Sequence, residues 1–251
     1  MYLCNITGQQ FDLNDNEKTR ESGVRFGFNN RFRAICYVLT KLLYGKCEVL
    51  HRLKPNKNIR GIGMSDSAWS YFLAKKFNYI NTFYHMPPYL DIYNNNHVKN
   101  YKELDFIISS DVFEHISPFP SVKIAFDNIY KMLKKKGFFI FSVPFTETEH
   151  KEHFPELYQY KIHKENDEYF LLNRTIDNNY QIFRDLCFHN GPGSVLEMRI
   201  FSKNSIINFL QKSGFVNIVF HEIDEDMNKH GIFWSKNNDD NLSIIISAQK
   251  I

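Results

Sequence analysis

The sequence predicts an α/β protein built on a doubly wound, mainly parallel sheet with helices on both faces. Short apolar runs alternate with segments in which apolar residues recur every three or four positions, as strands alternate with helices. The runs at 104–108 and 138–143 are almost continuously apolar, which is typical of strands covered on both faces. With 251 residues, 43% of them hydrophobic, the chain can bury such a core.

The N-terminal part of the chain differs from the rest. Residues 1 to about 30 are polar and show little periodicity, so we expect a loosely structured, accessory segment. From Arg31 the apolar residues recur at spacings of three and four, which predicts a helix that ends near Gly45. We therefore divide the chain into an N-terminal accessory segment and helix at 1–50 and a main domain at 51–251.

The main domain is predicted to begin with a strand, a tight turn and a helix, because the run at 59–64 is followed by apolar periodicity up to Phe77. Prolines close the strands that end at 85 and 143, since proline lacks the N–H that a sheet needs. The helix after the third strand is expected to end at Gly137, where Lys134–Lys136 would stabilise the negative end of the helix dipole. The remaining elements are strands at 79–85, 104–108, 138–143, 216–221 and 242–247, and a helix at 202–214.

Charge and composition argue against several classes of protein. The formal net charge is +3 and the basic residues are scattered, so no nucleic-acid partner is expected. No apolar stretch reaches the roughly 18 residues that span a membrane, and the N-terminus lacks a signal-peptide pattern. The 4 cysteines include no C-x-x-C pair, which argues against disulfides and zinc knuckles. We expect a cytoplasmic protein, and the sequence leaves its oligomeric state open.

The turn after the first strand of the main domain is the first candidate site. Ligands of doubly wound sheets bind at the carboxyl ends of the strands, and this turn usually supplies contacts to a cofactor. Gly61, Gly63 and Ser65 are small residues at alternate positions, which would let a cofactor approach the backbone. The start of the following helix would favour a carboxylate group of the ligand.

Residues 108–116, with the sequence ISSDVFEHI, are very similar to the fourth-strand signature of the ubiquinone-type methyltransferase superfamily. The order of elements over about ninety residues, from 59 to 145, resembles the core of class I S-adenosylmethionine-dependent methyltransferases. Shorter stretches, among them 152–157 and 188–193, look like a little-characterised bacterial subgroup of these enzymes. The resemblance implies a Rossmann-like fold, S-adenosylmethionine as cofactor and a methyl-transfer activity.

The resemblance also implies which residues hold the cofactor. Gly61 stands at the acidic position of the family signature, Gly63 at its first glycine and Ser65 at its second, so the motif is altered here. Asp66 is a candidate acceptor for the cofactor ammonium group, with an N-cap of the next helix as the alternative. The implied cofactor-binding residues are Gly61, Gly63, Ser65, Asp66, Tyr84, His85, Asp91, Ser110 and Asp111.

The later members of this set follow the second and fourth strands of the family core. No carboxylate ends the second strand, so Tyr84 or His85 is expected at the ribose. Asp91 resembles the aspartate that accepts from the adenine amino group, although a turn-forming role is the alternative. Ser110 and Asp111 stand where the reacting methyl group is expected.

Three histidines are the candidate catalytic residues. His115 lies four residues beyond Asp111, with a core or capping role as its alternative. His153 and His189 belong to an insertion at 146 to about 200, which we interpret as a lid over the methyl acceptor. A histidine whose pKa is near neutrality suits the removal of a proton from a hydroxyl or an amine.

The density of histidines in the insertion raises the question of a bound metal. Pro155 interrupts any helix that could carry the spacing His150-x-x-His153, and no H-E-x-x-H motif is present, so we assign no metal ligands. Glu197 and Arg199 are expected to form a structural ion pair, with an anionic acceptor for Arg199 as the alternative.

The predicted function is methyl transfer from S-adenosylmethionine to an oxygen or nitrogen of a small molecule or glycan precursor. The altered glycine motif supports an alternative, a catalytically inactive domain that serves as a cofactor-binding or interaction module. A polar pocket beside Ser110 would favour the enzyme, and a pocket filled with Phe and Tyr side chains would favour the module. A nicotinamide-dependent oxidoreductase is disfavoured, since the G-x-G-x-x-G turn is absent.

Overall fold

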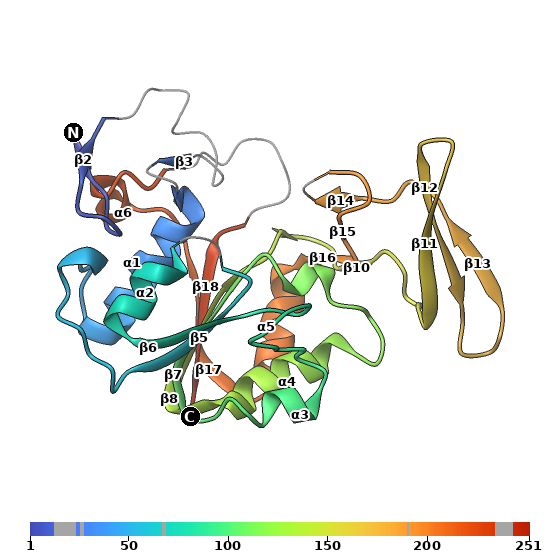
Figure 1. Ribbon diagram of the computed structural model, residues 1–251, viewed down its shortest axis with the longest axis horizontal. Helices are drawn as coiled ribbons and strands as arrows, with labels where there is room; N and C mark the ends of the chain where they lie inside the picture. The colour runs from blue at the N-terminus through green and yellow to red at the C-terminus, as the bar shows by residue number, and fades with distance from the viewer. Residues whose placement is uncertain (13–23, 26–27, 67–68, 190, 234–242) are drawn as a thin grey trace.

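A computed structural model describes residues 1–12, 24–25, 28–66, 69–189, 191–233 and 243–251. At its centre lies a six-stranded sheet with strand order β17-β18-β8-β7-β5-β6 (Figure 1). The strands are β5 (Arg60–Met64), β6 (Asn78–Thr82), β7 (Leu104–Ser110), β8 (Leu133–Ser142), β17 (Phe215–His221) and β18 (Ile245–Lys250). The pairs β5–β6, β5–β7 and β7–β8 are parallel, whereas β18 runs antiparallel to β8 and β17. The prediction of a mainly parallel sheet is confirmed.

Helices cover both faces of this sheet (Figure 1). They are α1 (Asn30–Tyr44) and α2 (Ser70–Lys76) on one face, and α3 (Asn95–Val98), α4 (Val122–Met132) and α5 (Lys203–Lys212) on the other. Side chains of β7 alternate between the two layers: Phe106 and Ile108 pack in the cluster that contains α1 and α2, and Ile107 packs in the cluster that contains α4 and α5. This double burial explains the continuous apolar run in the sequence.

Helix α1 forms where its periodicity predicts and packs against the sheet. The Asn29 side chain accepts a hydrogen bond from the Phe32 N–H at the start, and Gly45 ends the helix with φ 77°. Ala34, Ile35 and Val38 are completely buried in the cluster that also contains Trp69 and Leu73. The helix of the N-terminal segment is therefore part of one helical layer of the α/β core.

Residues 1–12 are packed, so the expectation of loose structure is wrong for this part of the N-terminus. They form the hairpin β1 (Tyr2–Leu3) and β2 (Gln10–Phe11), between which Cys4, Asn5 and Ile6 are completely buried. The Asn5 side chain donates to the Arg33 carbonyl at 2.7 Å, which ties the hairpin to α1. The other residues of the predicted loose segment, 13–23 and 26–27, lie outside the described residues.

The lysine run does not cap a helix, and that prediction is wrong. Helix α4 ends at Met132, and Lys134–Lys136 belong to the first part of β8. Lys134 forms an ion pair with Asp105 on the neighbouring β7. A Cβ at Gly137 would lie 2.7 Å from the Leu104 carbonyl oxygen, so the close approach of these two strands, rather than a helix end, requires the glycine.

The second strand of the main domain ends at Thr82, three residues before its predicted end. The Phe83 N–H donates to the Pro88 carbonyl at 2.9 Å, and the Leu90 N–H donates to the Phe83 carbonyl at 2.8 Å. These bonds fold residues 83–90 back on themselves, which places Tyr84 and His85 in an exposed turn.

The predicted insertion is rich in β-structure. Its strands are β9 (Phe145–Thr146), β10 (Lys151–Glu152), β11 (Gln159–Glu165), β12 (Glu168–Arg174), β13 (Tyr180–Phe183), β14 (Phe188–His189), β15 (Val195–Leu196) and β16 (Arg199–Ser202). Strands β11–β13 form an antiparallel sheet, here called the arm, that projects away from the α/β body (Figure 1). The hairpin of β14 and β15 lies between the arm and the body.

After the insertion the alternation resumes as predicted. Ser202 caps α5 through a reciprocal pair of hydrogen bonds with Ser205, and β17 and β18 complete the sheet. Leu242, the predicted first residue of the last strand, lies outside the described residues.

The shorter elements are β3 (Val24–Arg25), β4 (Phe28–Asn29), η2 (Leu50–Arg52), η3 (Phe113–His115) and α6 (Glu225–Lys229). Among the helices described, none combines the length and apolar character that crossing a membrane requires.

Candidate active site

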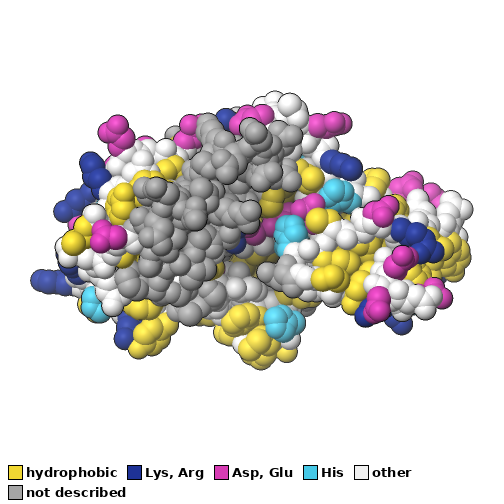
Figure 2. Space-filling model, turned by 90° about the horizontal axis from the view of Figure 1, so that it is seen from above, with side chains coloured by type: hydrophobic (Ala, Val, Ile, Leu, Met, Phe, Trp, Pro, Cys, Tyr) yellow, Lys and Arg dark blue, Asp and Glu magenta, His cyan; other side chains and the backbone are white. Residues whose placement is uncertain are grey.

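The parallel strands bring the predicted site residues to one edge of the sheet. Met64 pairs with Thr82 on one side and with Ser109 on the other, and Ser110 pairs with Ser142. The segments that follow β5, β6, β7 and β8 therefore meet at the carboxyl edge, where doubly wound sheets bind their ligands. Histidine and acidic side chains reach the surface between the α/β body and the arm when the molecule is seen from above (Figure 2).

Both glycines of the predicted turn lie within β5, which corrects the position of that turn. A Cβ at Gly61 would overlap the ring of Phe106, and a Cβ at Gly63 would overlap the Asp66 carboxylate and the Tyr79 hydroxyl. Glycine is therefore needed for packing inside the sheet. The turn itself begins at Ser65, an exposed residue with φ 56° whose N–H donates to the Thr82 carbonyl at 2.7 Å.

Asp66 is buried at the end of β5. Its carboxylate accepts a hydrogen bond from the Tyr79 hydroxyl, and its backbone exchanges two hydrogen bonds with the Asn81 side chain. Burial raises the pKa of Asp66 to about 7, although the hydrogen bond from Tyr79 opposes the rise. Helix α2 begins at Ser70 without a side-chain cap, so the alternative role of Asp66 as an N-cap is wrong.

The candidates after β6 are turn residues with different exposures. Tyr84 is 73% exposed and His85 is also exposed, so neither side chain packs in the core. Asp91 is half-buried, and its Oδ1 atom accepts from the Tyr93 N–H at 2.9 Å. This contact is the turn-forming one that the sequence left as the alternative for Asp91.

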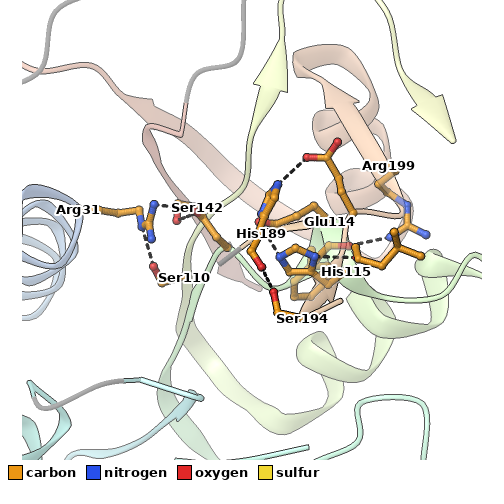
Figure 3. A network of polar contacts seen from close by, with 12 residues as sticks. Arg31, Ser110, Glu114, His115, Ser142, His189, Ser194 and Arg199 are labelled. Atoms are coloured by element: carbon orange, nitrogen blue, oxygen red, sulfur yellow. Dashed lines mark hydrogen bonds and ion pairs between the residues drawn. The ribbon is translucent and has the colours of Figure 1, made fainter. Parts of the chain in front are cut away.

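Ser110 and Asp111 are joined to a residue that the sequence did not single out. The Arg31 guanidinium donates through Nε to Ser110 Oγ at 2.9 Å and lies 2.5 Å from Asp111 Oδ2 through Nη1 (Figure 3). The other carboxylate oxygen of Asp111 accepts from the Ser142 hydroxyl at 2.6 Å. Arg31 lies in the first turn of α1, 79 residues before Ser110, so no local pattern could have pointed to the contact.

The three candidate catalytic histidines come together around Glu197. His153 Nε2 lies 2.9 Å from Glu197 Oε1, and His189 Nε2 lies 2.9 Å from Oε2 of the same carboxylate. The rings of His115 and His189 meet edge to face with their centroids 4.7 Å apart. We call His115, His153, His189 and Glu197 the histidine cluster. Its members come from η3, the segment after β10, β14 and the segment after β15.

Hydrogen-bond partners fix the tautomers in the histidine cluster. His115 Nδ1 lies 2.9 Å from the Leu196 carbonyl, which can only accept, so Nδ1 carries the hydrogen and Nε2 carries the lone pair. Burial lowers the pKa of His115, which favours this neutral form. Burial opposes ionisation of Glu197, but hydrogen bonds from His153 and His189 hold its pKa below the usual value.

Glu114, beside His115, was not predicted as a site residue. Its side chain is completely buried, and neither carboxylate oxygen has a hydrogen-bond partner among the described residues. Burial, and then the nearby Asp111 carboxylate, raise the pKa of Glu114 well above its usual value. The sequence signal was present, because a glutamate and a histidine adjoin within an otherwise apolar segment.

Arg199 holds the insertion against the end of β7. Its buried guanidinium donates through Nε to Glu152 at 2.7 Å and through Nη1 to the Phe113 carbonyl at 2.7 Å. The expected ion pair between Glu197 and Arg199 is therefore wrong, because Arg199 pairs with Glu152 and Glu197 bonds to histidines. Arg199 thereby links β10 and β16 to η3, and so positions the segments that carry the histidine cluster.

A family model described as a methyltransferase domain matches residues 31–219, which is more than half of the chain. No curated protein matches. The match begins at the residue that contacts Ser110 and Asp111, and it includes the whole histidine cluster.

Many solved structures resemble the fold at low sequence identity. An S-adenosylmethionine-dependent methyltransferase from Clostridium acetobutylicum is 13% identical, with 88% of this chain and 92% of that chain covered and a TM-score of 0.48. The 1,6-didemethyltoxoflavin-N1-methyltransferase of Burkholderia thailandensis is 12% identical, with coverages of 86% and 78% and a TM-score of 0.44. Phosphoethanolamine N-methyltransferase 2 of Haemonchus contortus is 13% identical, with coverages of 80% and 50% and a TM-score of 0.41.

Proposed function

Since the chain belongs to the family of methyltransferase domains, whose model matches residues 31–219, we propose that it transfers a methyl group from S-adenosylmethionine to an oxygen or nitrogen of a small molecule or glycan precursor. The observation that carries this proposal is the histidine cluster at the carboxyl edge of the sheet, beside the residues that follow β7. Methyl transfer requires alignment, exclusion of water and a group that accepts the proton of the acceptor.

The cofactor site that we propose is formed by the segments after β5, β6 and β7. Asp66 suits the cofactor ammonium group, since its Oδ1 atom is buried and has no hydrogen-bond partner among the described residues. Ser65, Tyr84 and His85 offer exposed polar groups at the same edge. Asp91, Ser110 and Asp111 complete the proposed set, and Gly63 contributes by leaving space for the Asp66 carboxylate. Gly61 is not retained in the set, because the Phe106 ring covers it.

The chemistry at the acceptor depends on the histidine cluster. When bound, S-adenosylmethionine supplies an electrophilic methyl group. An acceptor O–H or N–H must lose its proton as the new bond forms, and a neutral imidazole nitrogen is a suitable proton acceptor near neutral pH. Glu197 orients the rings of His153 and His189 and would stabilise the imidazolium that results, as a carboxylate does beside a catalytic histidine.

Calorimetric titration with S-adenosylmethionine and S-adenosylhomocysteine tests the cofactor part of the proposal. Micromolar binding of both is expected in the wild type, with weaker binding in Asp66→Ala and unchanged binding in the control variant Lys134→Gln, on the opposite end of the sheet from the site. A screen of hydroxyl- and amine-bearing acceptors then follows, with S-adenosylhomocysteine release as the readout. Absence of cofactor binding would support the rival function, an interaction module without catalysis.

A further inference from the structure

The proposed function does not account for the burial of the Glu114 carboxylate. The side chain is completely buried, and both carboxylate oxygens lack a hydrogen-bond partner among the described residues. A buried carboxylate in that state is unfavourable unless a proton or a cation neutralises it. Glu114 lies in η3, immediately before His115, and the His115 Nε2 atom is 3.6 Å from its Oε1 atom.

The imidazoles of His115 and His189 lie close enough to the Glu114 carboxylate for all three side chains to bind one ion. Ligand atoms of Glu114, His115 and His189 all lie within 4.8 Å of one another. The residues come from η3 and from β14 in the insertion, so an ion between them would join the insertion to the α/β body. Figure 3 shows the His115 and His189 rings next to Glu114, on the side of the network opposite Arg31.

In both histidines, the ring nitrogen that would not bind the ion forms a hydrogen bond, as is common in histidines that bind metals. The Leu196 carbonyl accepts from His115 Nδ1, which leaves the lone pair on the Nε2 atom that faces Glu114. The Glu197 carboxylate lies 2.9 Å from His189 Nε2 and accepts its hydrogen, which leaves the lone pair on Nδ1. A carboxylate behind one imidazole and a backbone carbonyl behind the other orient the rings and raise their basicity.

The balance of charge favours a cation in the same place. The Asp111 carboxylate is neutralised by Arg31, with which it forms an ion pair. Glu114 and Glu197, by contrast, are both buried among imidazoles, and no lysine or arginine forms an ion pair with either of them among the described residues. A divalent cation between Glu114 and the histidines would displace the proton of the Glu114 carboxyl group and balance the charges of Glu114 and Glu197.

Cys187, His189 and Glu197 form a second group of possible ligands, also within 4.8 Å of one another. In that group both Glu197 oxygens already accept hydrogen bonds from histidines, and Cys187 is exposed. The group at Glu114 is the better candidate, because its buried carboxylate, unlike that of Glu197, accepts no hydrogen bond from the part of the chain that the structure describes.

We propose that Glu114, His115 and His189 bind one divalent first-row transition-metal ion. Two imidazoles and one carboxylate are a ligand set used for zinc and non-haem iron, and three protein ligands leave positions open for a substrate atom. The role of the ion rests on the proposed function. The ion would bind the oxygen or nitrogen atom of the methyl acceptor and lower the pKa of its O–H or N–H group, and His153 would accept the proton. Metal binding itself requires neither the cofactor nor the acceptor.

The test uses the untagged full chain after removal of metals by a chelator. Zn²⁺ is titrated calorimetrically in the absence of cofactor, and the metal content after dialysis is measured by mass spectrometry. One ion per chain is expected in the wild type and in the control variant His163→Ala, whose histidine lies on β11 of the arm. Glu114→Gln and His189→Ala should each weaken Zn²⁺ binding by about tenfold or more, since each removes a ligand.

Circular dichroism and a separate cofactor titration complete the test. His189 lies on a hairpin and is partly exposed, so His189→Ala is expected to fold even if the buried Glu114→Gln variant does not, and circular dichroism checks both. Loss of Zn²⁺ binding in Cys187→Ser with full binding in Glu114→Gln would overturn the proposal, as would the absence of Zn²⁺ binding by the wild type. Because His189 belongs to both groups, Cys187→Ser must keep full binding for the proposal to stand if Glu114→Gln does not fold. Titration with S-adenosylmethionine, run separately, reports on the proposed function alone.

Discussion

The Nη1 atom of Arg31 lies 2.5 Å from Oδ2 of Asp111, and this ion pair joins the first turn of α1 to the carboxyl end of β7. Both side chains are only 17% exposed, so water screens the pair weakly. Asp111 also has φ 48°, a left-handed conformation that few residues other than glycine adopt, at the point where the chain leaves the sheet. The ion pair and the Ser142 hydroxyl hold this turn in place beside the histidine cluster.

Arg31→Met should lower the free energy of unfolding by about 1–3 kcal/mol, because it leaves the Asp111 carboxylate without its charged partner. Urea denaturation measures the change. The matched control is Lys134→Met, which removes the more exposed ion pair with Asp105 and should cost less than about 1 kcal/mol. Equal effects of the two substitutions would contradict a special role for the Arg31–Asp111 pair.

Asp66 should make stability depend on pH. Its pKa is about 7 in the folded chain, raised from 3.8 by burial, so the folded state holds a proton that the unfolded state releases. The stability that protonation provides is complete below pH 3.8 and is lost as the pH rises towards 7. Wild-type protein should therefore lose more than about 1 kcal/mol of stability, relative to Asp66→Asn, between roughly pH 5 and pH 8. If the free energies of unfolding of the two proteins changed with pH in the same way, Asp66 would be ionised over the whole range.

Gly63→Ala should destabilise the protein by about 1–3 kcal/mol, because the added Cβ would overlap both the Asp66 carboxylate and the Tyr79 hydroxyl. Thermal and urea unfolding measure the loss. In a double-mutant cycle with Tyr79→Phe the cost of the alanine should fall, since one of the two overlapping atoms is gone. Strict additivity would argue that the glycine serves another purpose.

Glu197→Gln tests the carboxylate that bonds to two histidines. An amide can accept from only one of His153 and His189 and presents an N–H to the other, so one ring loses its orientation. With an acceptor found by the screen, kcat should fall by about tenfold or more, while cofactor affinity stays unchanged. A parallel loss of cofactor affinity would instead indicate a general disturbance of the carboxyl edge.

Asp91→Ala should weaken binding of S-adenosylmethionine by about 1–3 kcal/mol, the scale of a lost hydrogen bond to a charged group. Asp91→Asn keeps an oxygen that can accept from the Tyr93 N–H, so it preserves the turn and serves as the control. Unchanged affinity in Asp91→Ala, measured by calorimetry, would remove Asp91 from the proposed cofactor site and leave it the role of a turn residue.

Much of the fold could be predicted from the sequence because it rests on local patterns. The buried strand β7 was visible as an apolar run, since both of its faces are covered, and α1 was visible as an apolar periodicity closed by Gly45. The lysine run shows the limit of such patterns. Its position suggested a helix end, but pairing between β7 and β8 and the ion pair with Asp105 place it in a strand.

The site was predictable only in part. The sequence identified His115, His153 and His189 as candidates, and the resemblance pointed to Ser110 and Asp111. It could not show that Glu197 bonds to a histidine 44 residues away, or that Arg31 reaches Asp111. Those contacts depend on the order of strands in the sheet and on the path of the insertion.

By itself, then, the sequence determined the alternation of elements, because burial on one face or on two leaves a periodicity that can be read along the chain. Only the tertiary structure decided which polar side chains meet. Electrostatic and hydrogen-bonding contacts act over a few ångströms in space, irrespective of distance along the chain. The burial of Glu114 without a hydrogen bond from any described residue therefore became apparent only in three dimensions.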